Sequence, residues 1–145
     1  MQTLKITSQM AHFRLIRRVD NVTAKGIRAE AKFERAPLYA GLEAMAQLAA
    51  LHVRQRFQFE RHAFLLTVQH CQMPDADVLE GPFRIVADLR SQSSNAFGYD
   101  ARALGPNGID FKSTLLIGTR DYDAHFQKDI LRAHYQGIFA EVSRQ

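Results

Sequence analysis

The chain has 145 residues, of which 46% are hydrophobic and 23% charged, and this composition fits one globular domain and excludes disorder. Its formal net charge is +4, but the basic residues are dispersed and lack the aromatic-plus-basic pattern of an RNA-binding motif, so no nucleic-acid partner is predicted. No stretch approaches the ~20 apolar residues of a membrane span, and the first residues lack a secretory-signal pattern, so we expect a cytoplasmic protein.

The chain begins with two predicted strands, followed by a long helix. Residues His12–Val19 alternate loosely between apolar and polar, and a second extended run, Gly26–Phe33, follows the polar pair Asp20-Asn21, which is typical of a hairpin. Glu34–Pro37 is a short loop, and the apolar pattern after it predicts a helix from about Leu38 to about Phe57.

Four more strands are predicted after the helix. The segments rich in β-forming residues are Phe64–Met73, Gly81–Leu89, Ala96–Leu104 and Ile109–Thr119. The sequence Gly105-Pro106-Asn107-Gly108 separates the last two and predicts a hairpin, because glycine and asparagine tolerate a positive φ. The apolar spacing over Asp123–Val142 predicts a terminal helix, with Asp121 or Asp123 as its cap.

This order of elements predicts an α+β fold with one antiparallel sheet wrapped around the central helix. A curled sheet would bury the helix on most sides, and the helix surface that one sheet leaves uncovered predicts a dimer. We expect a single domain over residues 1–145, with its core over about residues 10–120 and the terminal helix over about residues 123–142.

The helix segment Gly41–Arg54 is apolar on nearly all sides except for a narrow polar wedge. Glu43 lies in that wedge, with Gln47 one turn later, and a carboxylate in an apolar setting lowers stability unless it is paired. We therefore expect Glu43 to be buried and to have a function, with Gln47 or Tyr39 placed to hydrogen-bond it.

Other polar residues near the helix have structural interpretations. His52 lies on an apolar helix face and is predicted to be a hydrogen-bonded core residue. The basic group at the end of the helix, Arg54, Arg56, Arg61 and His62, is either a solvated helix end or a docking surface for an acidic carrier protein.

No metal site and no cofactor are predicted. The single cysteine, Cys71, excludes a disulfide framework and is interpreted as a strand residue. The other histidines are scattered without the spacing of a metal site on a helix; they include His62, His70, His125 and His134.

The sequence Glu43-Ala44-Met45-Ala46-Gln47 resembles the start of the central helix in the hotdog-fold 3-hydroxyacyl-acyl-carrier-protein dehydratases. It follows a hairpin, a loop and a glycine, as in that family, and the resemblance extends through strand order over about residues 10–120. The longer segment GLEAMAQLAALH is most similar to the dehydratase-like proteins of aryl polyene biosynthetic clusters, whose helix histidine corresponds to His52. The resemblance implies a hotdog fold and an acyl thioester carried by acyl carrier protein or coenzyme A.

In these dehydratases a histidine in an HFPxxP-like loop removes the α-proton, and the helix carboxyl group protonates the departing hydroxyl. The resemblance makes Glu43 that acid, and burial would favour its protonated form. The backbone N–H groups of Ala40 and Gly41, near the positive helix end, would hold the thioester carbonyl, with Gly41 allowing close approach and Gln47 completing the substrate site. The corresponding loop here, Lys32–Tyr39, contains no histidine.

Three functions remain open. The first is a dehydratase-like subunit of fatty acid, polyketide or aryl polyene biosynthesis, which takes its histidine from a second hotdog subunit in a homodimer or heterodimer. The second is a hotdog acyl thioesterase in which Glu43 is the nucleophile or base and no histidine is needed. The third is a non-catalytic acyl-binding or structural subunit, in which Glu43 has only a structural role.

Overall fold

The structure is a computed structural model and describes residues 15–121, 136, 139 and 140. Its strands and helix follow one another in the order predicted from the sequence. Strands β1, β2 and β4 run beyond their predicted ends, to Thr23, Ala36 and Gln92, so the turn between β1 and β2 lies at Ala24 and Lys25 and not at the predicted Asp20-Asn21. The elements are β1 (Ile16–Thr23), β2 (Gly26–Ala36), α2 (Tyr39–Arg56), β3 (His62–Gln72), β4 (Leu79–Gln92), β5 (Ala96–Leu104), the short 3-10 helix η1 (Pro106–Gly108) and β6 (Asp110–Arg120).

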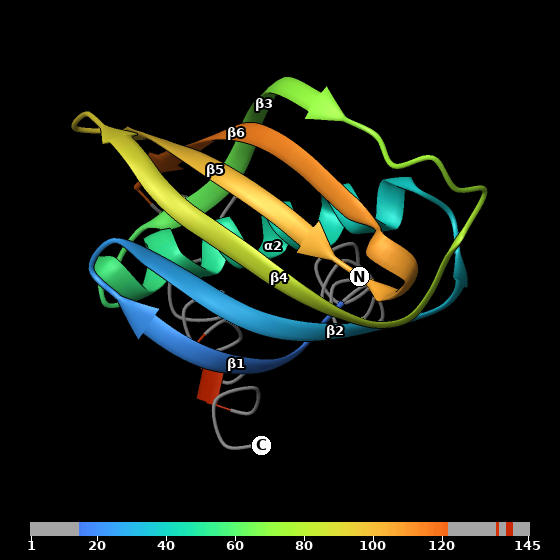
Figure 1. Cartoon of the computed structure of the whole chain (residues 1–145). Helices are drawn as coiled ribbons and strands as arrows, with labels where there is room; N and C mark the ends of the chain where they lie inside the picture. Colours follow the sequence, from blue (N-terminus) through green and yellow to red (C-terminus); the bar gives the residue numbers. More distant parts are fainter. Residues whose placement is uncertain (1–14, 122–135, 137–138, 141–145) are drawn as a thin grey trace, which may run out of the picture.

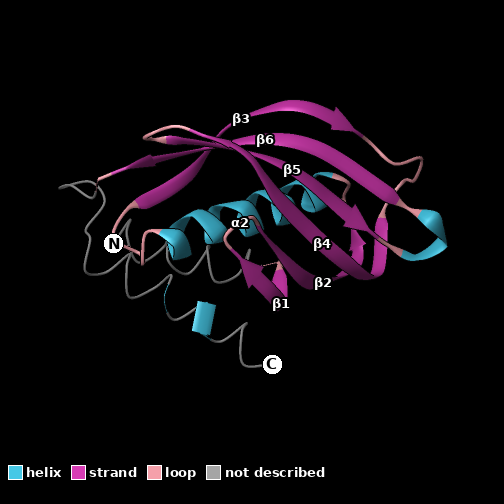
Figure 2. Ribbon diagram, turned by 60° about the vertical axis from the view of Figure 1, so that its left-hand side comes forward, coloured by secondary structure: helices cyan, strands magenta, loops and turns pink. Residues whose placement is uncertain are grey.

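The six strands form one antiparallel sheet in the order β1-β2-β4-β5-β6-β3. The sheet curls around α2, which lies along its concave side (Figures 1 and 2). Strands β1 and β3 are at the two edges, so each has one side that pairs with no strand of the described chain. The predicted architecture of a sheet wrapped around one helix is therefore confirmed.

The alternation of side chains along each strand explains how the sheet holds the helix. On β4, Phe83, Ile85 and Ala87 are buried, whereas the neighbouring Arg84 and Asp88 are exposed. A strand with this period of two places its apolar side chains on one face, and the buried side chains of the sheet and of α2 form one hydrophobic core. Burial of this apolar surface is the main term that stabilises the fold.

The hairpin between β5 and β6 has the backbone that the sequence predicts. Asn107 and Gly108 adopt positive φ values of 60° and 78°. Both residue types tolerate this conformation, so the chain reverses here without strain and β5 pairs with β6.

The predicted terminal helix, Asp123–Val142, lies almost entirely outside the described residues. Phe139 is one of the few described residues of this segment, and its ring centroid lies 5.8 Å from that of Phe59. The capping role of Asp121 or Asp123 therefore stays a prediction. Among the described residues, no helix is both long and apolar enough to cross a membrane.

Candidate functional site

Helix α2 begins with a tight turn that uses its first backbone amides. The N–H of Ala40 donates to the carbonyl of Pro37, and the N–H of Gly41 donates to that of Leu38, both at 3.0 Å. The two amides that were predicted to hold a thioester carbonyl are thus already hydrogen-bonded. An acyl oxygen bound there would have to share these donors with the turn.

Gly41 is buried against the sheet. A methyl group at this position would come within 3.0 Å of side-chain carbons of Leu79 and of Phe111. The space that a side chain would take is therefore filled, and the missing side chain serves the packing of helix on sheet; the predicted role of Gly41 in substrate binding stays a prediction.

Glu43 lies on the side of α2 that the sheet does not cover, and it is exposed in the single chain. The prediction that it is buried is therefore wrong for one subunit. The apolar residues that suggested burial, such as Ala44, Met45 and Leu48, are buried, whereas the polar wedge faces outward. Among the described residues, none forms a hydrogen bond or an ion pair with the Glu43 carboxylate.

Gln47 connects α2 to the beginning of the sheet. Its Oε1 accepts a hydrogen bond of 2.9 Å from the backbone N–H of Leu15, directly before β1. Tyr39, one turn before Glu43, is 71% exposed. Within the described part of the chain neither Gln47 nor Tyr39 hydrogen-bonds Glu43, so the expectation that one of them holds the carboxylate is not met.

His52 is fully buried and hydrogen-bonded, as predicted. Its Nε2 lies 2.8 Å from the carbonyl oxygen of Thr23, and its Nδ1 lies 2.5 Å from the hydroxyl oxygen of Tyr99. Since a carbonyl only accepts, Nε2 carries the proton and the Tyr99 hydroxyl donates to Nδ1. Burial lowers the pKa of His52, the hydrogen bond to Thr23 opposes this shift, and the charge of Arg56 adds to it.

Tyr99 is the partner of His52 that the sequence analysis missed. Burial raises its pKa, because the ionised phenol would be poorly solvated inside the core. The signal that could have found it is the period of two along β5, which places Tyr99 on the inner face, where a buried phenol needs a hydrogen-bond partner.

The basic group after α2 does not form one solvated surface. Arg54 is buried, with Nη2 donating to the carbonyl of Ala63 at 2.5 Å, and His62 is buried as well. Arg61 is half-buried and lies 3.5 Å from the carboxylate of Asp121. The predicted solvated helix end is thus wrong for Arg54 and His62, which are buried; Arg56 alone of the group is exposed.

The described part of the chain contains three of the histidines, His52, His62 and His70. Two of them are buried, and His70 is exposed on β3. No group of three His, Cys, Asp or Glu side chains in this part of the chain is arranged to hold a metal ion.

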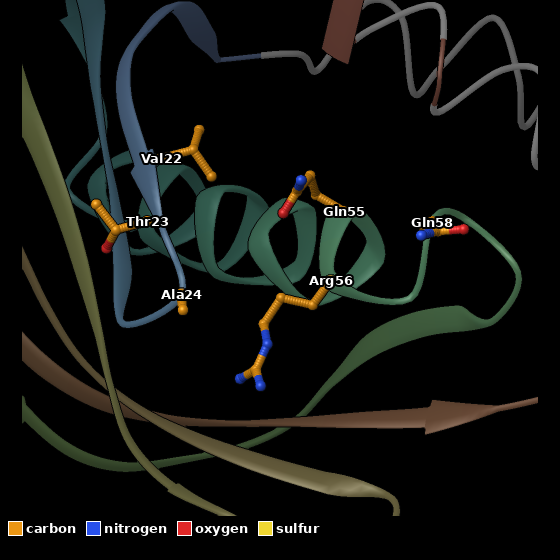
Figure 3. Close-up of a pocket in the computed structure, with 6 residues that line it drawn as sticks. All are labelled: Val22, Thr23, Ala24, Gln55, Arg56 and Gln58. Carbon is orange, nitrogen blue, oxygen red and sulfur yellow. The ribbon is translucent and has the colours of Figure 1, made fainter.

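A cavity that the sequence did not predict lies at the far end of α2 from Glu43. It has a volume of about 400 Å³ and opens between the β1–β2 turn and the last turn of the helix (Figure 3). Its lining residues are Val22, Thr23, Ala24, Gln55, Arg56 and Gln58.

The edge strand β3 carries exposed apolar side chains. Leu65 is 40% and Leu66 is 50% exposed, and β3 pairs only with β6 in the described structure. An open strand edge next to exposed leucines is a surface that a second polypeptide can cover.

Comparisons with known proteins give matches only at the level of three-dimensional structure. No protein-family model and no curated protein sequence matches the chain. The dehydratase heterocomplex ApeI:P from Xenorhabdus doucetiae matches with a TM-score of 0.64 and 14% identity, over 80% of this chain and 88% of that one. A mutant thioesterase from Staphylococcus aureus matches with a TM-score of 0.64 and 8% identity, over 78% and 98% of the two chains. A thioesterase from Haemophilus influenzae matches with a TM-score of 0.63 and 11% identity, over 81% and 86%.

This chain has the hotdog fold. The matches cover most of each chain and agree with the observed six-stranded sheet around one helix. At these low identities the likeness shows the fold alone, and the hotdog neighbours include both a dehydratase and thioesterases. The hotdog fold predicted from the sequence is confirmed, while the choice between the two reactions rests on the chemistry of the site.

Proposed function

We propose that this chain is an acyl-thioester-binding hotdog protein of the dehydratase type, with Glu43 as its catalytic carboxylate and a second hotdog subunit completing the site. One observation carries the proposal: Glu43 is an exposed carboxylate near the start of α2 that no described residue pairs with. A carboxylate placed on a largely apolar helix without a structural partner is available to a ligand. The match to a dehydratase heterocomplex supports the dehydratase type.

The second subunit is argued from two exposed surfaces. The open edge of β3, with Leu65 and Leu66, can pair with an edge strand of another hotdog subunit and so extend the sheet. In the proposed dimer the partner also covers the outer side of α2 and excludes water from Glu43. Burial of this kind is what a carboxyl group needs in order to act as a proton donor.

In the proposed reaction a base removes the α-proton of a 3-hydroxyacyl thioester, and Glu43 gives its proton to the departing hydroxyl. The products are an enoyl thioester and water. Of the described histidines, His52 and His62 are buried and His70 lies on the edge strand β3. We therefore assign the base to a histidine that the second subunit contributes, in a homodimer or in a heterodimer, with the thioester carried by acyl carrier protein or coenzyme A.

Hydrolysis of an acyl thioester is the second candidate. The open position of Glu43 favours it, because a hydrated carboxylate suits an anion that attacks the carbonyl or activates water, and not a proton donor. This reaction releases the free acid and the thiol and needs no histidine. Thioesterases are among the matched hotdog structures.

The test measures both reactions on the same preparations. Formation of the enoyl thioester and release of free thiol are followed with the chain alone and with a co-expressed hotdog neighbour from the same genome. We expect dehydration either by the chain alone, which indicates a homodimer, or only with the co-expressed neighbour, which indicates a heterodimer. In both cases Glu43→Gln should lower the rate by about 100-fold or more, as for removal of a general acid. Glu30→Gln is the matched control, because Glu30 pairs with Arg18 on the outer sheet face, and it should leave the rate unchanged.

The other outcomes separate the remaining functions. Thiol release by the chain alone that disappears in Glu43→Gln would establish the thioesterase. No turnover in any combination, or equal rates for wild type and Glu43→Gln, would leave a non-catalytic acyl-binding or structural subunit.

A further inference from the structure

The cavity at the end of α2 takes no part in the proposed reaction. At a rise of ~1.5 Å per residue, Arg56 lies about 20 Å beyond Glu43 along the helix axis. Figure 3 shows the Arg56 side chain extending from the last turn of the helix, with Thr23 and Ala24 of the β1–β2 turn on one side and Gln58 on the other. The cavity is therefore a separate site with its own chemistry.

Arg56 is the one charged residue among those that line the cavity. Several arginines elsewhere on the molecule, though not all, are paired with carboxylates: Arg18, Arg28, Arg61, Arg90 and Arg102 form ion pairs to Asp or Glu, whereas Arg84 forms none with a described residue. No ion pair with a described residue reaches Arg56. Its guanidinium, with five N–H donors, is thus available to a ligand in the cavity.

The helix dipole does not oppose an anion here as strongly as an open helix end would. The last carbonyls of a helix carry partial negative charge when they lack partners. In α2 they are capped by the backbone N–H groups of residues 57, 58 and 59, which donate to the carbonyls of Val53, Gln55 and Arg54 at 3.2, 3.0 and 2.8 Å. The charge of Arg56 therefore dominates the cavity.

The backbone that follows the helix has an unusual conformation at the cavity wall. Gln58 and Phe59 have φ values of 54° and 62°, a region that residues other than glycine rarely adopt. Phe59 is buried and fixes the turn, while Gln58 is exposed and lines the cavity. These two residues close a Schellman motif, a common helix end, in which the N–H groups of Gln58 and Phe59 donate to the carbonyls of Gln55 and Arg54, so the backbone of this cavity wall is fixed by hydrogen bonds.

We propose that this cavity binds a small oxyanion, the phosphate or carboxylate group of a metabolite, with the guanidinium of Arg56 as its main ligand. The planar fork of arginine matches the oxygens of either group. The cavity has a volume of about 400 Å³ and is open to solvent, since Thr23, Arg56 and Gln58 are exposed, so an anion can reach the guanidinium directly from solution. The inference depends neither on Glu43 nor on a second subunit.

His52 provides a built-in reporter of occupancy. It is buried behind the cavity wall, where its Nε2 donates to the carbonyl of Thr23. The charge of Arg56 contributes to the lowered pKa of His52. An anion bound to Arg56 would offset that charge, so the pKa of His52 should rise when the cavity is filled.

The experiment is an NMR titration of the backbone amides and of the His52 ring at constant ionic strength. The probes are inorganic phosphate, acetate and coenzyme A. We expect saturable shifts at the cavity residues with phosphate or acetate, and binding weaker by about tenfold or more in Arg56→Gln, as for loss of a charge-assisted bond. Arg84→Gln is the control: it removes one positive charge from the exposed face of β4, away from the cavity, and should bind the anions with the affinity of the wild type.

Coenzyme A identifies the source of the group. Binding of coenzyme A that is tighter than that of inorganic phosphate and is lost in Arg56→Gln indicates a phosphate borne by a larger molecule, whereas equal affinities indicate a small free anion. Arg56→Lys keeps the positive charge but loses the planar fork of donors, so its affinity for the anion should lie between that of the wild type and that of Arg56→Gln. The proposal is overturned if no probe gives saturable shifts, or if folded Arg56→Gln and Arg84→Gln have the same affinity for phosphate.

Discussion

The imidazole of His52 and the phenol of Tyr99 form a hydrogen-bonded pair in the core, with 2.5 Å between Nδ1 and the hydroxyl oxygen. Both side chains are 0% exposed. Their ring planes are perpendicular, with centroids 5.5 Å apart. With Nε2 of His52 bound to Thr23, one neutral ring joins α2 to β5 and to the end of β1.

Removal of the Tyr99 hydroxyl should destabilise the fold. In Tyr99→Phe the buried Nδ1 of His52 loses its donor, and an unsatisfied buried acceptor costs about 1–3 kcal/mol of the free energy of unfolding. Urea denaturation measures this change. Tyr39→Phe is the control, since Tyr39 is exposed and should change stability by less than about 0.5 kcal/mol. Equal effects of the two substitutions would contradict the role of the pair.

The free energy of unfolding should decrease as the pH falls below the pKa of an ordinary histidine. Burial lowers the pKa of His52 below the ordinary histidine value of 6.5, so the unfolded chain binds a proton there before the folded chain does. The contribution of neutral His52 is therefore complete above pH ~6.5 and is lost progressively below it. Urea midpoints measured across this range, together with the His52 ring signals, test the effect. Ring signals that titrate in the folded protein at or above the usual pKa of histidine would refute it.

Charge on the edge of β3 should prevent the proposed association. Substituting Leu65 and Leu66 together by arginine removes apolar contact surface and places like charges on two strands that would pair, so we expect the dimer Kd to rise about tenfold or more. Sedimentation over a range of concentrations, alone and with a hotdog neighbour, gives the Kd. Val86→Arg, on the outer face of β4, is the control and should not change the Kd. A wild-type chain that stays monomeric in both settings would rule out this interface.

The elements of the fold were predictable because they depend on local patterns. The period of two along the strands, the turn residues at Asn107 and Gly108, and the apolar run of α2 each specify their own structure. The hotdog arrangement then follows from the need to bury one helix under one sheet.

The surroundings of the site were not predictable, because they depend on contacts between distant residues. His52 and Tyr99 are separated by 47 positions, and Gln47 and Leu15 by 32. A helical wheel with apolar residues on both sides cannot tell which side the sheet covers, and the expected burial of Glu43 failed for that reason. Arg54 is buried with its Nη2 donating to the carbonyl of Ala63, a partner that no local pattern reveals.

Thr23 connects the cavity to His52. The residue forms part of the cavity wall, and its carbonyl oxygen accepts a hydrogen bond from Nε2 of His52. The positive charge that a proton adds to the His52 ring and the negative charge of an anion bound to Arg56 would attract each other, so each would favour binding of the other. Thermodynamic linkage is reciprocal, so the factor by which the anion strengthens proton binding is the factor by which acid strengthens anion binding. A chain with this connection would hold its ligand more tightly in acidic surroundings and release it as the pH rises towards neutrality.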